Sequence, residues 1–301
     1  ATMQPPIIAY AVERIYQASG DEEFKNAALP VLMGFYRWLR RMRDPDNDGL
    51  IAVIQPEEAG TDCSPKYDEV LGLEELSNQG FITALRKVYA AYEPLRGDDH
   101  RVLAADLFHV EDVLVNSIYV MGLRSLARLL GDAPEAAEFN READKTRDAL
   151  IAKCWDEEVG AFFDLSGVAE TPLKVVTISS LMPLVMEDLP RPIVERLVDT
   201  WVTDPKHFWT PYPLPSVPAS DPKFMPGNPR GFIWRGPSWM NTNWFLSHAL
   251  RRHGYGELAD TIVAKSQECI EKSGFREYYE PFTAEGLGAR DFGWSTLILD
   301  M

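Results

Sequence analysis

The chain is poor in cysteine and histidine, and this limits the metal and redox chemistry that it can carry. It has three cysteines among 301 residues, Cys63, Cys154 and Cys269, and they form no Cys-x-x-Cys pair. An odd, widely spaced set does not make a disulfide framework, so it favours a reducing cytoplasm. The five histidines never recur at the His-x-x-x-His spacing of a helical zinc site. We therefore expect neither a metal nor any other cofactor.

Basic side chains are also scarce. Lysine and arginine together number 30 against 46 aspartates and glutamates, which gives a formal net charge of −16. An acidic surface repels phosphates, so we expect no nucleic acid and no anionic membrane as a partner, whereas a small carbohydrate is not disfavoured. We also expect no apolar run long enough to cross a bilayer. Together with the cysteines, this predicts a cytoplasmic protein.

Helical periodicity dominates the chain, and strand signals are few. Apolar residues recur at helical spacing, and proline and glycine mark many of the segment ends. The helices expected from this pattern are 5–19, 22–43 with a kink or restart at Pro30, 110–130, 134–154, 174–186, 190–202, 238–253, 256–272 and a last one that starts near Trp294. Residues 155–164 are predicted to end a helix and form a short hairpin.

Paired helices with more apolar and more polar faces predict an all-α toroid of helical hairpins, with the site on long loops at one end. The stretch 204–227, rich in proline and aromatic residues, is longer than a plain connector needs, and such loops are usually functional. We expect residues 1–301 to form one catalytic domain. The chain opens directly into helical periodicity and stops inside an apolar run, which predicts a missing N-terminal piece or a partner chain that supplies it.

A first candidate acid lies in the loop that runs to Pro65. Asp62 follows Gly60 and precedes Cys63-Ser64-Pro65, a setting typical of a turn or a helix N-cap. The functional alternative is a carboxyl shielded from water, whose raised pKa lets it protonate a leaving oxygen. Lys66 and Asp68 lie close enough in sequence to tune such a group.

A second candidate is Glu277, which stands among aromatic residues directly ahead of the glycine-rich segment 286–295. A lone glutamate between Arg276 and Tyr278 is most often a surface residue, and Glu280 and Glu285 compete with it. A carboxylate between an aromatic wall and a glycine-rich loop, however, is well suited to hold an activated water beside a sugar ring.

The segment 232–244 combines three tryptophans with an arginine and two asparagines at a predicted helix start. An aromatic stripe at helical spacing is more often core than ligand site. Pro237 suits the first helical position, so Trp234 and Arg235 would precede the helix and project from its mouth. Sugars stack their C–H faces on indoles and pair their hydroxyls with such side chains, so a carbohydrate role is an equal alternative.

Two further patterns are weaker. Asp44-Pro45-Asp46-Asn47-Asp48-Gly49 matches the first half of a calcium loop, but its twelfth position is Gln55, so a tight acidic turn is favoured. Asp112 and Asn116 are spaced to share one helix face and could point into the toroid, or could be satisfied within the core.

Taken together, these segments resemble glycoside hydrolase family 63, and more widely the inverting α-glycosidases that include trehalase. The likeness covers most of the chain and is greatest to the compact bacterial hydrolases of mannosylglycerate and glucosylglycerate. It is carried by residues 59–65 with Asp68, by Trp234-Arg235-Gly236-Pro237 with Trp239 and Asn243-Trp244, and by the segment from Glu277-Tyr278-Tyr279 to Trp294-Ser295. The resemblance implies an (α/α)6 toroid of twelve main helices. About ten are expected here, so the N-terminal helices would be lacking.

The resemblance also implies inverting hydrolysis, with Asp62 as general acid and Glu277 as general base. Their carboxyl groups would lie on the order of 6.5–9.5 Å apart. The residues expected to bind substrate are Tyr67, Asp68, Asp112, Asn116, Trp234, Arg235, Gly236, Trp239, Asn243, Tyr279, Arg290 and Trp294, with Arg290 facing the carboxylate of a glycerate group. Cys63 departs from the asparagine frequent in the family. The alternatives are a disaccharide hydrolase like trehalase or α-glucosidase, and a sugar-binding toroid without activity.

Overall fold

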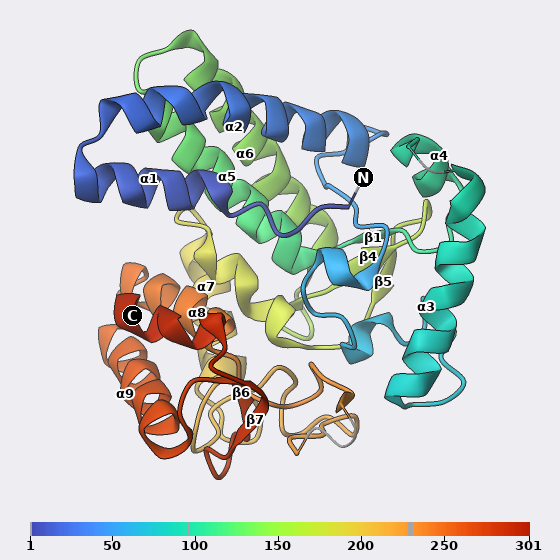
Figure 1. Ribbon diagram of the computed structural model, residues 1–301, viewed down its shortest axis with the longest axis vertical. Helices are drawn as coiled ribbons and strands as arrows, with labels where there is room; N and C mark the ends of the chain where they lie inside the picture. The colour runs from blue at the N-terminus through green and yellow to red at the C-terminus, as the bar shows by residue number, and fades with distance from the viewer. Residues whose placement is uncertain (1, 96, 228–230) are drawn as a thin grey trace. The chain divides into compact units, whose positions relative to one another are not determined.

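The computed structural model describes residues 2–95, 97–227 and 231–301, and most of them are helical (Figure 1). The chain divides into two compact units. Unit 1 comprises Ala1–Gly60, Arg86–Trp155 and Asp164–Leu173, and unit 2 comprises Thr61–Leu85, Asp156–Phe163 and Lys174–Met301. The predicted helical character is confirmed. The assignment of residues 1–301 to one catalytic domain stays a prediction.

Unit 1 is built on four helices that pack side by side. Its helices are α1 (Ile8–Ser19), α2 (Glu22–Arg43), α5 (Val113–Leu130), α6 (Pro134–Ala149), the short α4 (Asp99–Ala104), the 3₁₀ helices η1 (Pro56–Glu58) and η3 (Glu93–Leu95), and the π-helix η4 (Leu150–Cys154). Helix α5 contacts α1, α2 and α6, so it forms the centre of this group (Figure 1).

Helix α2 follows the sequence prediction closely. The Asp21 side chain caps its first turn by accepting a hydrogen bond from the Phe24 N–H (2.9 Å), and Arg40, Arg41 and Arg43 lie in its last turn, where cations stabilise the free carbonyl groups. The helix runs from Glu22 to Arg43 with Pro30 inside it, so the restart considered at Pro30 does not occur.

Helix α5 contradicts the expectation that the chain has no apolar run long enough to cross a bilayer. The Asp112 carboxylate caps it through the Val115 N–H (3.1 Å), and Gly131 ends it. By length and composition alone, Val113–Leu130 is apolar enough to cross a membrane, with a mean hydropathy of 1.3. However, 83% of the segment is buried inside the protein, as in the central helix of a soluble domain.

Unit 2 combines the short 3₁₀ helix η2 (Pro65–Tyr67) with helices from the C-terminal part of the chain. The latter are η5 (Ile178–Val185), α7 (Arg191–Leu197), the π-helix η6 (Val198–Val202), α8 (Met240–Arg252), α9 (Gly256–Ser273) and η8 (Gly293–Asp300). Helix α8 packs against α9, η5 and η8.

Two of the predicted helices are 3₁₀ helices in the structure. The segment 174–186 forms the 3₁₀ helix η5, which begins at a capping box on Thr177 and contains Pro183, whose ring lacks the N–H that a longer α-helix needs. The last segment is the 3₁₀ helix η8. Helix α3 (Asn78–Tyr92), which begins in unit 2 and ends in unit 1, and α4 were not predicted at all.

Among the residues that the structure describes, three small sheets accompany the helices. In unit 1 the strand order is β1 (Val110–Glu111), β4 (Asp164–Ser166), β5 (Thr171–Leu173). Strand β2 (Trp155–Asp156), where the chain passes from unit 1 to unit 2, pairs with β3 (Ala161–Phe162), which confirms the predicted hairpin. In unit 2, β6 (Arg276–Tyr279) pairs with β7 (Gly286–Arg290), so the segment predicted as a glycine-rich loop is half strand.

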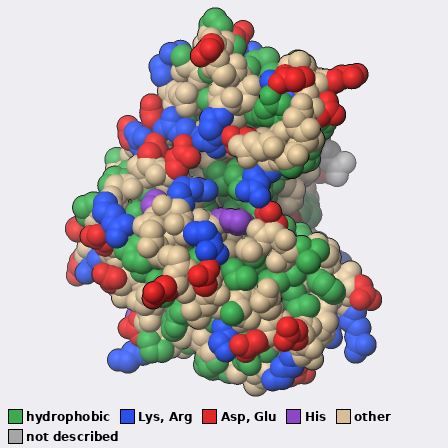
Figure 2. Space-filling model, turned by 90° about the vertical axis from the view of Figure 1, so that its left-hand side faces the viewer, with side chains coloured by type: hydrophobic (Ala, Val, Ile, Leu, Met, Phe, Trp, Pro, Cys, Tyr) green, Lys and Arg blue, Asp and Glu red, His purple; other side chains and the backbone are tan. Residues whose placement is uncertain are grey.

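The surface charge is mixed. On the face drawn in Figure 2, acidic and basic side chains lie interspersed among apolar and uncharged ones. The net charge of −16 is therefore not gathered into a single acidic patch on this face.

Unit 1 holds a fully buried ion pair between Arg43, at the end of α2, and Glu58, in η1. Both side chains are 0% exposed. The Glu58 carboxylate accepts hydrogen bonds from Nη1 and Nη2 of Arg43 (2.7 and 2.8 Å) and from the backbone N–H groups of Met3 and Ile54 (2.9 Å each). It thus fastens the N-terminal segment and the loop after α2 to the same helix.

Replacing Glu58 by alanine should lower the free energy of unfolding by about 3–5 kcal/mol, because the buried Arg43 charge would lose its bidentate partner and, among carboxylates, keep the longer contact of its Nε with Asp99 (3.5 Å). The matched control is Glu138→Ala, which removes a partly exposed partner of Arg37 in the same unit. It should cost about 1 kcal/mol or less. Chemical denaturation monitored by circular dichroism measures both, and equal losses in the two variants would contradict this assignment.

Candidate active site

The acid-bearing segment enters unit 2 as a tight turn. The Ser64 N–H donates to the Thr61 carbonyl (2.9 Å), which makes Asp62 and Cys63 the central residues of the turn. Asp62 is half-buried. The turn leads directly into η2, whose C-cap residue is Asp68. The turn that the sequence allowed is therefore present, and it leaves the Asp62 side chain partly accessible.

Cys63 points into an apolar cluster. It is 4% exposed and packs with Phe81, Leu85 and Phe232. A small apolar side chain suits this position better than an amide would, which gives a local reason for the departure from the family pattern.

A buried ion pair fastens this segment to the tryptophan-rich segment. The Asp68 carboxylate accepts hydrogen bonds from Nη1 (3.1 Å) and Nη2 of Arg235, whose side chain is 0% exposed. Lys223 adds a second cation, with Nζ 3.0 Å from the same carboxylate. The Arg235 guanidinium also lies over the Phe232 ring at 3.9 Å. Asp68 and Arg235, predicted as substrate-binding residues, thus contact each other.

Next to Arg235, four aromatic rings form a compact group. Trp234 stacks on Trp239 with ring centroids 3.9 Å apart and an interplanar angle of 2°, and Tyr278 lies 4.5 Å from Trp239. Trp294 lies 5.7 Å from Trp239. The first three rings are at most 3% exposed, whereas Trp294 is 37% exposed. Of these four rings, Trp294 is therefore the one that is accessible to solvent.

Trp234 also has an unusual backbone. Its φ of 61° lies in the left-handed region, which is rare for a bulky residue and recurs at functional sites. Within the described residues, the buried indole Nε1 of its stacking partner Trp239 has no hydrogen-bond partner.

Glu277 owes its placement to a β-bulge in the β6–β7 hairpin. Arg276 is opposite Arg290 and Tyr278 is opposite Leu287, so one residue of β6, Glu277, faces two residues of β7. The first of these, Gly288, has a φ of 64°, the left-handed conformation typical of a glycine bulge. The second, Ala289, donates its N–H to Oε2 of Glu277 (2.9 Å).

This hairpin leaves no room for a side chain at position 288. A Cβ there would overlap Oε2 of Glu277 and lie 2.7 Å from Cε1 of Tyr278. In the described part of the chain, no hydrogen bond reaches the other carboxylate oxygen, Oε1. Glu277 is half-buried beside Tyr278, so one oxygen is fixed and the other is available.

Glu280 and Glu285, the two alternatives to Glu277, lie in different surroundings. Oε2 of Glu280 accepts hydrogen bonds from the N–H groups of Phe282 (2.9 Å) and Thr283 (2.6 Å), so it caps the turn of the hairpin. Glu285 is exposed.

Three residues that were predicted to bind substrate make contacts within the protein framework. The Tyr279 hydroxyl is bonded to the Gly274 carbonyl (2.8 Å) and receives the Arg276 N–H (3.0 Å). The Asn243 amide bonds Pro213 and Leu214 on the long loop (2.8 and 2.9 Å).

The third of them, Gly236, has a φ of 153°, and a Cβ there would lie 2.8 Å from the Pro226 backbone nitrogen. It therefore allows two backbone segments to approach closely.

The remaining predicted residues are placed as follows. In unit 1, Asn116 exchanges hydrogen bonds with both backbone groups of Ile51 (2.8 and 2.9 Å), and Asp112 caps α5, which favours the core role that the sequence left open. In unit 2, Tyr67 is 1% exposed, and its hydroxyl lies 3.4 Å from that of Thr61. Arg290 is exposed at the end of β7.

The long loop 204–227 connects these segments within unit 2, and its described residues form no helix and no strand longer than a single bridge. Ser238 bridges to Pro215 of the loop and to Tyr279 of β6. The loop also supplies Lys223, which the sequence did not single out because an isolated lysine carries no motif. Gly288 could have been found, since a glycine between Leu287 and Ala289 marks a bulge in a strand.

A family model described as the mannosylglycerate hydrolase MGH1-like glycoside hydrolase domain matches residues 1–295. The mannosylglycerate hydrolase of Thermus thermophilus is 29% identical over 98% of this chain and 75% of its own length. The glucosylglycerate hydrolase of Mycolicibacterium hassiacum is 27% identical over 97% of this chain and 72% of its own length.

Solved structures agree with these matches. The family 63 mannosylglycerate hydrolase of Thermus thermophilus, in complex with Tris, has a TM-score of 0.90 and is 29% identical in sequence. The match covers 100% of this chain and 77% of the Thermus chain. The neutral trehalase Nth1 of Saccharomyces cerevisiae, at 14% identity and a TM-score of 0.67, shares the fold alone over 99% of this chain and 61% of its own. These likenesses confirm the predicted all-α fold class of helical hairpins. The predicted lack of N-terminal helices stays a prediction.

Replacing Gly288 by alanine should lower the free energy of unfolding by about 1–3 kcal/mol, because a left-handed φ and an overfilled hairpin both oppose the new Cβ. Gly293→Ala is the control, since nothing lies within 4 Å of a Cβ built there. It should change stability by about 0.5 kcal/mol or less. Denaturant titration compares the two, and an unchanged stability of Gly288→Ala would contradict the bulge.

Proposed function

Since the chain belongs to the mannosylglycerate hydrolase MGH1-like glycoside hydrolases, it is a glycoside hydrolase, and we propose that it hydrolyses an α-glycoside of glycerate with inversion. The sugar is mannose or glucose, as the names of the Thermus and Mycolicibacterium relatives suggest. The observation that carries the proposal is the setting of Glu277, a half-buried carboxylate oriented by a glycine bulge beside an aromatic group.

Glu277 is the proposed general base. The Ala289 N–H fixes Oε2, and Oε1 accepts a proton from a water molecule that attacks the anomeric carbon. Because the bulge and the Tyr278 ring restrict the side chain, the carboxylate is oriented before substrate arrives. Such positioning is part of how an enzyme lowers the entropic cost of the reaction.

Asp62 is the proposed general acid. Its carboxyl group gives a proton to the glycosidic oxygen as the bond to the anomeric carbon breaks, so the products are glycerate and a sugar of inverted anomeric configuration. Room for the attacking water requires that the two carboxyl groups lie on the order of 6.5–9.5 Å apart. Exchange of one proton with solvent at each carboxyl restores the starting state.

The sugar and the glycerate need separate contacts. Trp294, the exposed ring of the aromatic group, suits stacking against the C–H face of the sugar, while the buried Trp234 and Trp239 support it from behind. The glycerate carboxylate needs a cation, and Arg290 is exposed on the same hairpin as Glu277. In a chain of net charge −16, such a local cation offsets the repulsion of an anionic substrate.

The isosteric variants Glu277→Gln and Asp62→Asn should each lower kcat by about 10²–10⁴-fold on mannosylglycerate or glucosylglycerate, because each removes one proton-transfer group. Glu285→Gln, which changes an exposed carboxylate of the same hairpin, should retain activity. Stopped assays of released glycerate measure the rates, and near-ultraviolet circular dichroism verifies the fold of each variant.

Full activity of Glu277→Gln would overturn the assignment of the base. The same assays with trehalose and kojibiose test the substrate class. A higher kcat/KM for either disaccharide than for both glycerate glycosides would identify a disaccharide hydrolase instead. Sugar binding without turnover of any of the four compounds would identify a non-catalytic protein.

A further inference from the structure

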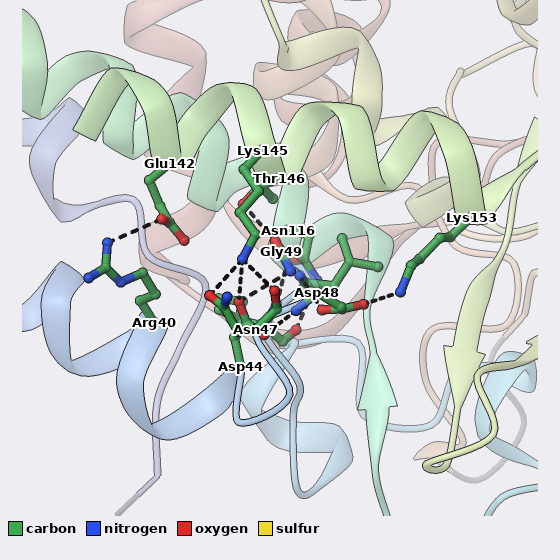
Figure 3. Close-up of polar contacts among 12 residues, drawn as sticks. Arg40, Asp44, Asn47, Asp48, Gly49, Asn116, Glu142, Lys145, Thr146 and Lys153 are labelled. Carbon is green, nitrogen blue, oxygen red and sulfur yellow. Dashed lines mark hydrogen bonds and ion pairs between the residues drawn. The ribbon is translucent and has the colours of Figure 1, made fainter. Parts of the chain in front are cut away.

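Polar contacts connect helix α6 to helix α2 and to the turn that follows α2 (Figure 3). Nη1 of Arg40 donates to Oε2 of Glu142 (3.3 Å), and the Thr146 hydroxyl donates to the Gly49 carbonyl (2.7 Å). The Asp44 carboxylate accepts the Gly49 N–H (3.2 Å), as in the tight turn that the sequence favoured. The contact between α2 and α6 in unit 1 is therefore partly polar, and water can be accommodated along it.

A small cavity lies along this contact. It has a volume of about 10 Å³ and is lined by side chains of α2, α5 and α6. Its charged groups are paired. Arg37 lies 2.6 Å from Glu138, and Arg40 lies 3.3 Å from Glu142. Because two cations face two carboxylates, the cavity carries no excess charge, and it suits a neutral polar molecule better than an ion.

The Tyr119 hydroxyl lines this cavity and lacks a partner. The Tyr119 ring packs parallel to that of Tyr36, with centroids 5.9 Å apart and an interplanar angle of 10°. The Tyr36 hydroxyl donates to the Pro6 carbonyl, in space that Gly122 leaves because it has no Cβ. Tyr119 is also fully buried, but within the described residues its hydroxyl has no hydrogen-bond partner. Such a group is costly, and native proteins usually satisfy it.

Glu142 supplies a complementary acceptor on α6. Its side chain is 10% exposed, and in the part of the chain that the structure describes no hydrogen bond reaches its Oε1, because Arg40 donates to Oε2. Burial first, and then the Glu142 charge, raise the pKa of Tyr119 well above its ordinary value, so the phenol keeps its proton and can donate. A donor on α5 and an acceptor on α6 thus line the same cavity.

We propose that this cavity binds one structural water molecule, which accepts a hydrogen bond from Tyr119 and donates one to Oε1 of Glu142. A cavity needs about 10–15 Å³ to hold a water, which agrees with the volume of about 10 Å³. Buried waters make about three hydrogen bonds, and the Arg40 guanidinium, which also lines the cavity, offers a further donor.

The bound water would connect three helices of unit 1: α2 through Arg40, α5 through Tyr119 and α6 through Glu142. The residues proposed for sugar hydrolysis, Asp62 and Glu277, lie in unit 2. The proposed role of the water is therefore to stabilise unit 1, and it takes no part in proton transfer to the substrate.

High-resolution crystal structures of the wild type and of Tyr119→Phe test the site. The wild type should show one water within about 3.2 Å of both Oη of Tyr119 and Oε1 of Glu142, and Tyr119→Phe should lack it. The control is Tyr36→Phe, which removes the neighbouring buried hydroxyl. It should keep the water, because the Tyr36 hydroxyl is bonded to the Pro6 carbonyl.

Thermal unfolding gives a second readout whose sign depends on the water. If the water satisfies Tyr119, Tyr119→Phe should lower Tm by about 1–4 °C, because a net favourable hydrogen bond is lost. Removal of an unsatisfied hydroxyl would instead leave Tm unchanged or raise it.

An unchanged or raised Tm of Tyr119→Phe would therefore overturn the proposal. So would a wild-type crystal structure in which Tyr119 donates directly to Glu142 with no water between them, and this structure decides the question even if the variant fails to fold. A water that stays in place in Tyr119→Phe would show that Tyr119 does not hold it, and density for an ion would contradict a neutral ligand.

Discussion

The ion pair between Asp68 and Arg235 is the interaction on which the candidate active site depends. The guanidinium is fully buried, so it needs its carboxylate partner, and loss of that partner would leave an unpaired charge in the core. Asp68 ends the segment that begins with Asp62, and Arg235 adjoins Trp234. Through the stack of Trp234 on Trp239 and the contact of Trp239 with Tyr278, the pair is linked to the hairpin that carries Glu277. The segment of the proposed acid and that of the proposed base thus share one continuous set of contacts within unit 2.

Unusual backbone conformations gather along the same path. Trp234, Gly236 and Gly288 have φ angles of 61°, 153° and 64°. Gly236 allows a close approach of two backbone segments, and Gly288 turns the Glu277 carboxylate toward the Ala289 N–H. Of the three, Trp234 is the non-glycine residue, and a left-handed φ in a bulky residue persists only where the surrounding structure fixes it; such conformations recur at functional sites. The well-packed tryptophans and the buried ion pair supply that support here.

The sequence predicted some of this architecture and missed the rest for identifiable reasons. Helix α2 begins and ends where predicted, because its cap, its arginines and its apolar spacing are all local signals. The segment 178–185 was misjudged, because Pro183 and the Thr177 cap favour a 3₁₀ helix despite an apolar helical pattern. Tyr279 and Asn243 were assigned to substrate, yet their polar groups bond backbone atoms. For Asn243 these atoms lie about 30 residues away in sequence, a relation that no local pattern records. Lys223 was missed for the same reason, since its partner Asp68 is distant in the chain.

The central claim, that Asp62 and Glu277 act from opposite faces of the sugar with a water between them, is tested most directly by the anomer first released. Proton NMR spectra recorded within the first minutes of hydrolysis of an α-mannoside or α-glucoside of glycerate distinguish the two anomers before mutarotation mixes them. The account predicts that the β-anomer appears first, because a single displacement inverts the anomeric carbon. Initial release of the α-anomer would mean a covalent intermediate and two displacements, and it would contradict the roles given to both carboxylates.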